Sequence, residues 1–253
     1  MDNVPHWIAN KPWSPDEERQ LELLGGMLVP GVVPASVCRE VLEDAAMECQ
    51  SRSVQFSDIK KRGNGHRVDV LMRFTPAVRE LVGALQKHFG WENQTSVVEL
   101  SVITTKTGAR NQPMHTDSSG ARGEAVLLTI GVALVPISES QGPTEIRLGT
   151  HTEYYHDNDN SEWDEPMITS GGFCVGDVVI WDSRVHHRGT AHVSGPPRSL
   201  LVLSVLRGPG VRPDGPTYSL RNEYPESVPV GTIVDALPIQ LTKRTNEAIF
   251  TAR

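Results

Sequence analysis

Hydrophobic residues change their spacing near residue 95. Before this point they recur every three or four residues, which predicts amphipathic helices over residues 15–24, 34–50 and 76–89. Ser14 and Thr75 each precede a proline and fit the N-cap positions of the first and third of these helices. The first third of the chain is therefore predicted to be helical.

Beyond residue 95, short β-branched and apolar runs alternate with turns rich in glycine and proline, a pattern typical of strands. The predicted strands are residues 96–105, 125–137, 144–148, 172–181 and 199–206. Helices followed by many short strands indicate a mainly β fold with flanking helices. We expect a barrel or two-sheet sandwich whose N-terminal helices pack on one sheet.

No linker or internal repeat divides the chain, so we predict a single domain over residues 1–253. Its parts would be a helical segment at about 14–90, a barrel at about 96–206 and a C-terminal wrap over the surface at 207–253. The polar and basic residues 50–66 are predicted to form a mobile loop.

Composition argues against several functions. The chain carries 24 basic and 31 acidic residues, a net charge of −7, which is unfavourable for sequence-independent binding of nucleic acid. No apolar run reaches the ~18 residues of a membrane helix, and the N-terminal sequence does not resemble a secretory signal. Three cysteines without a CxxC spacing indicate a reducing compartment. We therefore expect a cytoplasmic protein that acts on a small molecule.

Histidines are concentrated in one region, with six of the nine between residues 115 and 192. His115 and Asp117 are two residues apart and would point to the same face of a strand. His186 or His187, after the predicted strand 172–181, could reach the same cavity; strand neighbours face opposite ways, so only one of them can enter it. Two histidines and a carboxylate form the facial triad of non-haem Fe(II) oxygenases.

An arginine follows this possible metal site. Arg198 lies eleven residues after His187, beyond a Ser-Gly-Pro-Pro turn, and opens an otherwise apolar strand. Its planar guanidinium suits bidentate binding of a carboxylate. A surface ion pair is the alternative role for this side chain.

These motifs together resemble the phytanoyl-CoA dioxygenase (phytanoyl-CoA hydroxylase) family. The resemblance covers about residues 25–206 and rests on the order and spacing of its parts. They are the opening segment 25–45, His-Thr-Asp at 115–117, GPTEIRLGTH at 142–151, His-Arg-Gly at 187–189 and Arg198. Leu148 and Thr150 stand where the family usually has proline and serine, a departure that touches no expected ligand.

The resemblance implies a double-stranded β-helix, that is, a jelly roll or cupin-like barrel, which uses Fe(II), 2-oxoglutarate and O2. It implies His115, Asp117 and His187 as iron ligands, because the His-Arg-Gly pattern selects His187 over His186. It also implies Arg198 at the far carboxylate of 2-oxoglutarate. Other residues expected near the cosubstrate are Thr129, Thr104 and Gln112.

The expected reaction is oxidation, most simply hydroxylation, of an unactivated C–H bond, with release of succinate and CO2. In related iron halogenases a small residue replaces the carboxylate ligand, so the presence of Asp117 favours oxygenation. The same triad also suits desaturation, epoxidation or cyclisation, and these alternatives stay open.

Two other functions are weighed against this one. The first is a non-redox metal-binding cupin-like isomerase or binding module, which would have no need of Arg198. The second is a degenerate scaffold, which the complete set of side chains argues against.

The substrate is not predicted beyond a small or lipid-like metabolite, for example one of secondary metabolism, and the oligomeric state stays open. The basic residues of the predicted loop and its border suggest either an anionic substrate or simply a solvated loop; they are Lys60, Lys61, Arg62 and Arg67. The C-terminal Thr-Ala-Arg is not a peroxisomal address of the SKL type.

Overall fold

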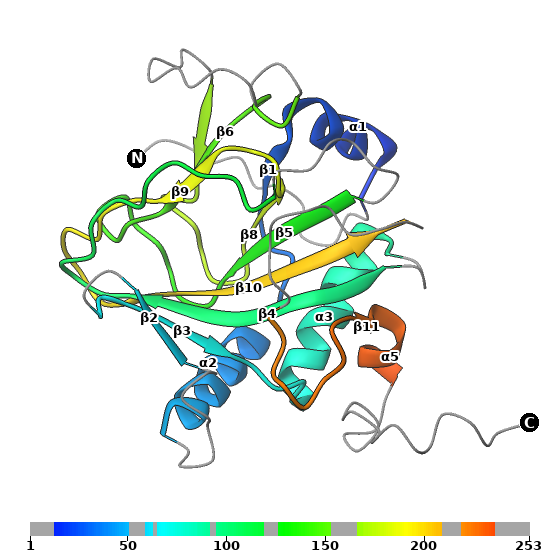
Figure 1. Ribbon diagram of the computed structural model, residues 1–253, viewed down its shortest axis with the longest axis horizontal. Coiled ribbons are helices and arrows are strands. Elements are labelled where there is room, and N and C mark those ends of the chain that lie inside the picture. The colour runs from blue at the N-terminus through cyan, green and yellow to red at the C-terminus, as the bar shows by residue number, and fades with distance from the viewer. Residues whose placement is uncertain are drawn as a thin grey trace, which may run out of the picture.

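Two antiparallel sheets face each other in the computed structural model, with helices against the outer side of the larger one (Figure 1). The structure describes residues 13–50, 59–62, 65–91, 95–118, 126–152, 166–208 and 219–235. No helix within these ranges is long and apolar enough to cross a membrane.

The larger sheet has eight strands, and its order differs from the order along the chain. Across the sheet the strands are β1 (Gly26–Val29), β8 (Val178–Asp182), β5 (Val126–Ala133), β10 (Arg198–Arg207), β4 (Ser96–Thr105), β3 (Arg67–Leu71) and β2 (Ile59–Arg62). A short strand, β11 (Val228–Pro229), also pairs with β4. The smaller sheet contains β7 (Met167–Thr169), β6 (Thr144–Arg147) and β9 (His187–Gly189), in that order. This mainly antiparallel architecture confirms the predicted fold class.

The described helices are α1 (Pro15–Leu24), α2 (Ala35–Gln50), α3 (Pro76–Phe89) and α5 (Val230–Asp235). The first three match the predicted ranges to within a residue. Ser14 caps α1 through a capping box with Glu17, and the hydroxyl of Thr75 accepts the Val78 N–H at the start of α3. The caps expected from the sequence are therefore present.

Two apolar clusters divide the interior. The larger one joins the helices to the outer face of the eight-stranded sheet, where Leu81 of α3 and Leu100 of β4 are fully buried. The smaller one lies between the sheets and includes Trp181, Ile146 and Leu200. Because it fills only part of the space between the sheets, polar side chains can share this inner face.

The loop predicted over residues 50–66 is wrong for Ile59–Arg62, which form β2 and pair with β3. β2 is the edge strand of the sheet, and an edge strand tolerates the lysines and arginine that made this segment look like a loop. Residues 51–58 and 63–64 of the predicted loop lie outside the described part of the chain.

Residues 219–235 were expected to wrap over the surface, but they anchor in the core. Val230 and Ile233 of α5 are fully buried, and β11 pairs with the first residues of β4. Arg221 is 3% exposed, and its Nη1 lies 3.0 Å from Oε2 of the buried Glu48 on α2. The buried ion pair between Arg221 and Glu48 ties this segment to α2, and a hydrophobic pattern alone could not predict it.

Replacing Arg221 by methionine should lower the free energy of unfolding by about 3–5 kcal/mol, because it leaves Glu48 as a buried carboxylate without its closest cation. Urea denaturation followed by circular dichroism would measure this loss. Arg207→Met is the matched control, because its ion pair with Glu18 is about one-third exposed and should contribute at most about 1 kcal/mol. An equal loss in both variants would contradict a stabilising role of the buried pair.

Candidate active site

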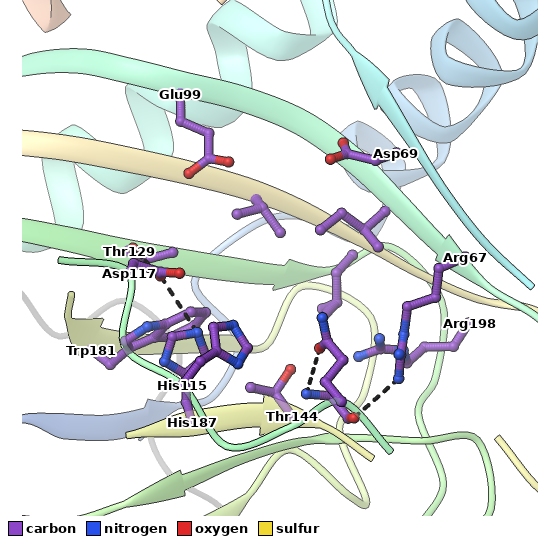
Figure 2. A pocket seen from close by; sticks show the side chains of 15 residues that line it. Arg67, Asp69, Glu99, His115, Asp117, Thr129, Thr144, Trp181, His187 and Arg198 are labelled. Atoms are coloured by element: carbon purple, nitrogen blue, oxygen red, sulfur yellow. Dashed lines mark hydrogen bonds and ion pairs between the residues drawn. The ribbon is translucent and has the colours of Figure 1, made fainter. Parts of the chain in front are cut away.

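A cavity of about 110 Å³ opens between the two sheets (Figure 2). The larger sheet contributes one face of alternating residues from β3, β4, β5, β8 and β10, and the segment 111–117 with β6 and β9 closes the other side. Its lining comprises Arg67, Asp69, Glu99, Ile103, Gln112, His115, Asp117, Thr129, Thr144, Trp181, His187, Gly189, Arg198, Leu200 and Val202. Polar groups are thus present at both ends of the cavity, and Ile103, Leu200 and Val202 line the part between them.

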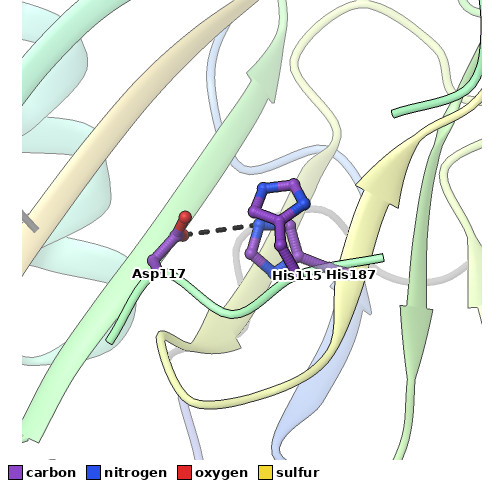
Figure 3. A group of neighbouring side chains, drawn as sticks. All are labelled: His115, Asp117 and His187. Atoms are coloured by element: carbon purple, nitrogen blue, oxygen red, sulfur yellow. Dashed lines mark ion pairs between the residues drawn. The ribbon is translucent and has the colours of Figure 1, made fainter. Parts of the chain in front are cut away.

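The predicted triad lies together at one end of this cavity (Figure 3). His115, Asp117 and His187 each offer one ligand atom, and these atoms all lie within 4.8 Å of one another. Nε2 of His187 is 3.4 Å from Oδ2 of Asp117. His115 and His187 form an antiparallel backbone bridge, and their rings lie 4.5 Å apart. The register of this bridge therefore aligns the two imidazoles.

Hydrogen bonds to backbone carbonyls fix the orientation of both imidazoles. Nδ1 of His115 lies 2.9 Å from the carbonyl of Pro113, and Nδ1 of His187 lies 3.0 Å from the carbonyl of Val185. A carbonyl only accepts, so in the neutral ring Nδ1 must carry the proton and Nε2 keeps its lone pair. Burial lowers the pKa of His187, which favours this neutral form.

Asp117 is held from two directions. Its backbone N–H donates to the carbonyl of Ser183, and the hydroxyl of Thr129 donates to its Oδ2 at 3.4 Å. The Thr129 oxygen also lies 3.2 Å from the hydroxyl of Ser204 on β10. Thr129 thus lines the cavity at the triad end.

Arg198 lies at the other end of the cavity and is buried, with 3% of its surface exposed. Its Nη2 donates to the hydroxyl of Thr105, while Nε and Nη1 have no hydrogen-bond partner among the described residues. Burial, and secondarily the nearby Arg67, lower the pKa of Arg198 to about 10, so it stays charged at neutral pH. A buried cation with two unsatisfied donors indicates a site for an anion.

Arg67 also reaches this end of the cavity, next to Arg198 (Figure 2). Both arginines stand opposite Thr105 in the strand register, one from β3 and one from β10. The Nη2 of Arg67 donates to the carbonyls of Gly189 and Thr190 on and after β9. Oε1 of Gln112 accepts a hydrogen bond from the Gly189 N–H at 2.7 Å. Arg67 and Gln112 therefore both hold the end of β9 in place.

The other predicted residues differ in whether they line the cavity. His187 lines the cavity, whereas His186 does not; its backbone N–H donates to the Thr150 hydroxyl. Thr104 does not line the cavity either, because its hydroxyl meets Ser199 on the opposite face of the sheet and the adjacent Thr105 contacts Arg198. Thr129 is paired with Ser204, six residues from Arg198 along β10, a separation of about 20 Å. The geometry therefore places Thr129 beside Asp117 rather than beside Arg198.

Sequence reasoning missed several residues of the cavity. Arg67 was grouped with a predicted loop, although the run from Arg67 to Leu71 forms a buried strand. Glu99 and Ser204 were read only as parts of apolar strands, and Asp69 was not considered. A single charged residue inside an otherwise apolar strand, as at Glu99, was the signal that could have identified a cavity.

Comparisons with known proteins agree with this geometry. The family model for phytanoyl-CoA dioxygenase (PhyH) matches residues 24–200. Among solved structures, the non-haem α-ketoglutarate-dependent carbocyclase SnoK from nogalamycin biosynthesis is similar, with 16% identity, a TM-score of 0.62 and coverage of 78% of this chain and 87% of that one. AviO1 from Streptomyces viridochromogenes Tue57 shows 15% identity, a TM-score of 0.57 and coverage of 77% and 95%.

A third structure contains ligands. It is the epimerase SnoN in complex with Fe3+, α-ketoglutarate and nogalamycin RO, with 17% identity, a TM-score of 0.55 and coverage of 89% of this chain and 90% of that one. No curated protein sequence matches the chain. At these identities the solved structures support the fold, and the family model, which spans most of the chain, supports the chemistry. The chain belongs to the phytanoyl-CoA dioxygenase family and is a 2-oxoglutarate-dependent non-haem iron oxygenase.

Proposed function

We propose that this enzyme hydroxylates an unactivated C–H bond of a small metabolite, with His115, Asp117 and His187 as the iron ligands. The observation that carries the proposal is the arrangement of the cavity. A two-histidine, one-carboxylate triad and a buried arginine with two unsatisfied donors line one pocket. The triad suits Fe(II) and leaves coordination positions open.

The side chains of the cavity fit the two ends of 2-oxoglutarate. Arg198 would hold the far carboxylate through Nε and Nη1, and Arg67 adds a second positive charge at this end. When bound, Fe(II) with 2-oxoglutarate and O2 supplies the oxidant for the C–H bond, with succinate and CO2 as coproducts. Ile103, Leu200 and Val202 form an apolar wall that would exclude water from the reacting groups.

The cupin-like isomerase or binding module is less consistent with this cavity. Such a protein binds its metal without an oxo-acid cosubstrate, so it would gain nothing from a buried arginine. Arg198 lies in the same cavity as the triad, which a purely structural ion pair would not require.

Similar enzymes support a small natural product as the substrate. SnoK and SnoN come from the biosynthesis of nogalamycin, and SnoN was solved with nogalamycin RO bound. By analogy, we place this enzyme among those that modify small metabolites rather than macromolecules.

Anaerobic addition of Fe(II) and 2-oxoglutarate should produce a visible charge-transfer absorption, since the 2-oxo acid chelates iron through its carboxylate and keto oxygens. Glutarate, which has both carboxylates but no keto oxygen, is the matched control and should give no band. Admission of O2 should then convert 2-oxoglutarate to succinate. The proposal fails if 2-oxoglutarate gives no band, or if the band decays in O2 without succinate.

A further inference from the structure

Three polar side chains form a row across three apolar strands of the larger sheet. Thr129 on β5 is opposite Ser204 on β10, and Ser204 is opposite Glu99 on β4. Thr129 and Ser204 are 2% and 3% exposed, and burying a hydroxyl costs free energy unless it is hydrogen-bonded. Neither hydroxyl belongs to the ligand set or to the cosubstrate site described above. A row of this kind at the triad end of the cavity therefore points to a further role.

The hydroxyl protons of this row can be assigned from their partners. Ser204 donates to Oε2 of Glu99 at 2.6 Å, so its oxygen can only accept from Thr129, which lies 3.2 Å away. The hydroxyl of Thr129 also donates to Oδ2 of Asp117 at 3.4 Å. A hydroxyl carries one proton, and both distances exceed the usual O–H···O separation of about 2.7–2.8 Å. The proton of Thr129 is therefore shared between Ser204 and Asp117.

Thr129 is placed to set the direction of the Asp117 carboxylate (Figure 2). The backbone N–H of Asp117 donates to the carbonyl of Ser183 at 2.8 Å, which fixes the main chain but leaves the side chain free to rotate. Among the described residues, Thr129 is the one hydroxyl or amide that donates to this carboxylate. Nε2 of His187 lies 3.4 Å from the same oxygen, but it carries no proton in the neutral ring and cannot donate.

We propose that Thr129 is a positioning residue of the metal site, whose hydroxyl turns the Asp117 carboxylate towards His115 and His187. This inference rests on the proposed function, because it takes these three side chains as the iron ligands. Hydrogen bonds from surrounding residues orient a ligating carboxylate, and their loss commonly costs about 10–100-fold in metal affinity. Ser204 weakens the bond from Thr129 to Asp117, since it competes for the same proton.

Metal affinity can be measured without turnover. Mn(II) binds to ligands of the same kind as Fe(II), and the loss of the EPR signal of free aqueous Mn(II) reports its binding to the metal-free protein. Thr129→Val removes the hydroxyl and keeps the shape of the side chain, and it should bind Mn(II) at least about tenfold more weakly than the wild type. Thr129→Ser keeps the hydroxyl and should bind within about threefold of the wild type.

Thr104→Val is the matched control. Thr104 forms the same kind of threonine–serine pair, with its hydroxyl 3.0 Å from that of Ser199 across β4 and β10, but on the face of the sheet away from the cavity. Its loss should leave the affinity for Mn(II) within about twofold. Ser204→Ala removes the competing acceptor, so Thr129 can donate to Asp117 alone. This variant should bind Mn(II) at least as tightly as the wild type.

Unchanged affinity in Thr129→Val, or an equal loss in Thr129→Ser, would overturn the inference. An equal loss in Ser204→Ala or Thr104→Val would overturn it too, because it would show that the effect comes from packing. Thermal unfolding of the metal-free variants shows whether each has folded. If Thr129→Val has not, Thr129→Ala and Thr129→Ser give the same comparison, since these two side chains differ only in the hydroxyl.

The two proposals can fail separately. If the wild type binds no metal, or if Asp117→Ala binds Mn(II) as tightly as the wild type, the proposed ligand set fails. If Asp117→Ala loses binding while Thr129→Val keeps it, only the role of Thr129 is refuted.

Discussion

Replacing His187 by alanine should weaken Fe(II) binding by more than about 100-fold, because even residues behind the ligands commonly contribute 10–100-fold to metal affinity. Asp117 and His115 would then be left as two ligands, too few for the facial geometry. The anaerobic charge-transfer band should disappear at Fe(II) concentrations that saturate the wild type. Succinate formation should fall to about 1% of wild type or less.

His186→Ala is the control for this experiment. It removes the same side chain from the neighbouring residue. That residue lies outside the cavity, and its backbone N–H donates to the Thr150 hydroxyl. This variant should keep both the band and the turnover within about twofold of wild type, as expected for a residue away from the site. Loss of the band in His186→Ala with retention in His187→Ala would reverse the ligand assignment. Thermal unfolding of both variants would show whether either has simply failed to fold.

Replacing Arg198 by methionine should raise the KM for 2-oxoglutarate about 100-fold, because the far carboxylate would lose a buried charge-assisted partner. Methionine has a similar length and no charge, so the packing against Thr105 should largely persist. At saturating 2-oxoglutarate the charge-transfer band should keep its position, since the iron ligands are unchanged. Arg198→Lys should fall between wild type and methionine, because an ammonium cannot reproduce the fork of a guanidinium.

The same substitution should not destabilise the protein without its cosubstrate. Burial and Arg67 both lower the pKa of Arg198, which means that the folded protein disfavours this charge when no anion is present. The melting temperature of the metal-free Arg198→Met protein should therefore equal or exceed that of wild type, while protection by 2-oxoglutarate is lost. Arg188→Met, whose ion pair with Glu145 lies outside the cavity, should leave the KM within about twofold. A large fall in the melting temperature of Arg198→Met would indicate a structural role instead.

The sequence predicted the helices and the long strands because their patterns are local. Val78, Leu81 and Leu85 repeat at helical spacing, and a capping threonine marks where α3 begins. β2 and β3 escaped prediction because charged residues interrupt them; only pairing with β4 decides that Arg67 and Asp69 face inward. Their burial depends on a partner more than 30 residues away in the sequence.

In the candidate site, too, residues in short local motifs could be predicted, whereas residues placed by strand pairing could not. His115, Asp117 and His187 could be proposed from short motifs, since a two-residue spacing on a strand already brings side chains to one face. Thr129 and Thr105 could not be assigned to the two ends of the cavity without the register of β10 against β4 and β5. Likewise, Glu99 could not be placed at the triad end of the cavity without the register of β4 against β10, in which it pairs with Ser204.

The order of strands in the larger sheet also determines when each strand can find its partner during synthesis. β4 and β5 follow each other in the chain, yet β10 must insert between them, about 70 residues after β5 begins. β1 has to wait even longer, because β8 is its one partner among the described strands. On the ribosome, most of the sheet would stay open until β10 has been made, and closure over such distances is slow. The first half of the chain thus depends for its stability on strands that are synthesised late.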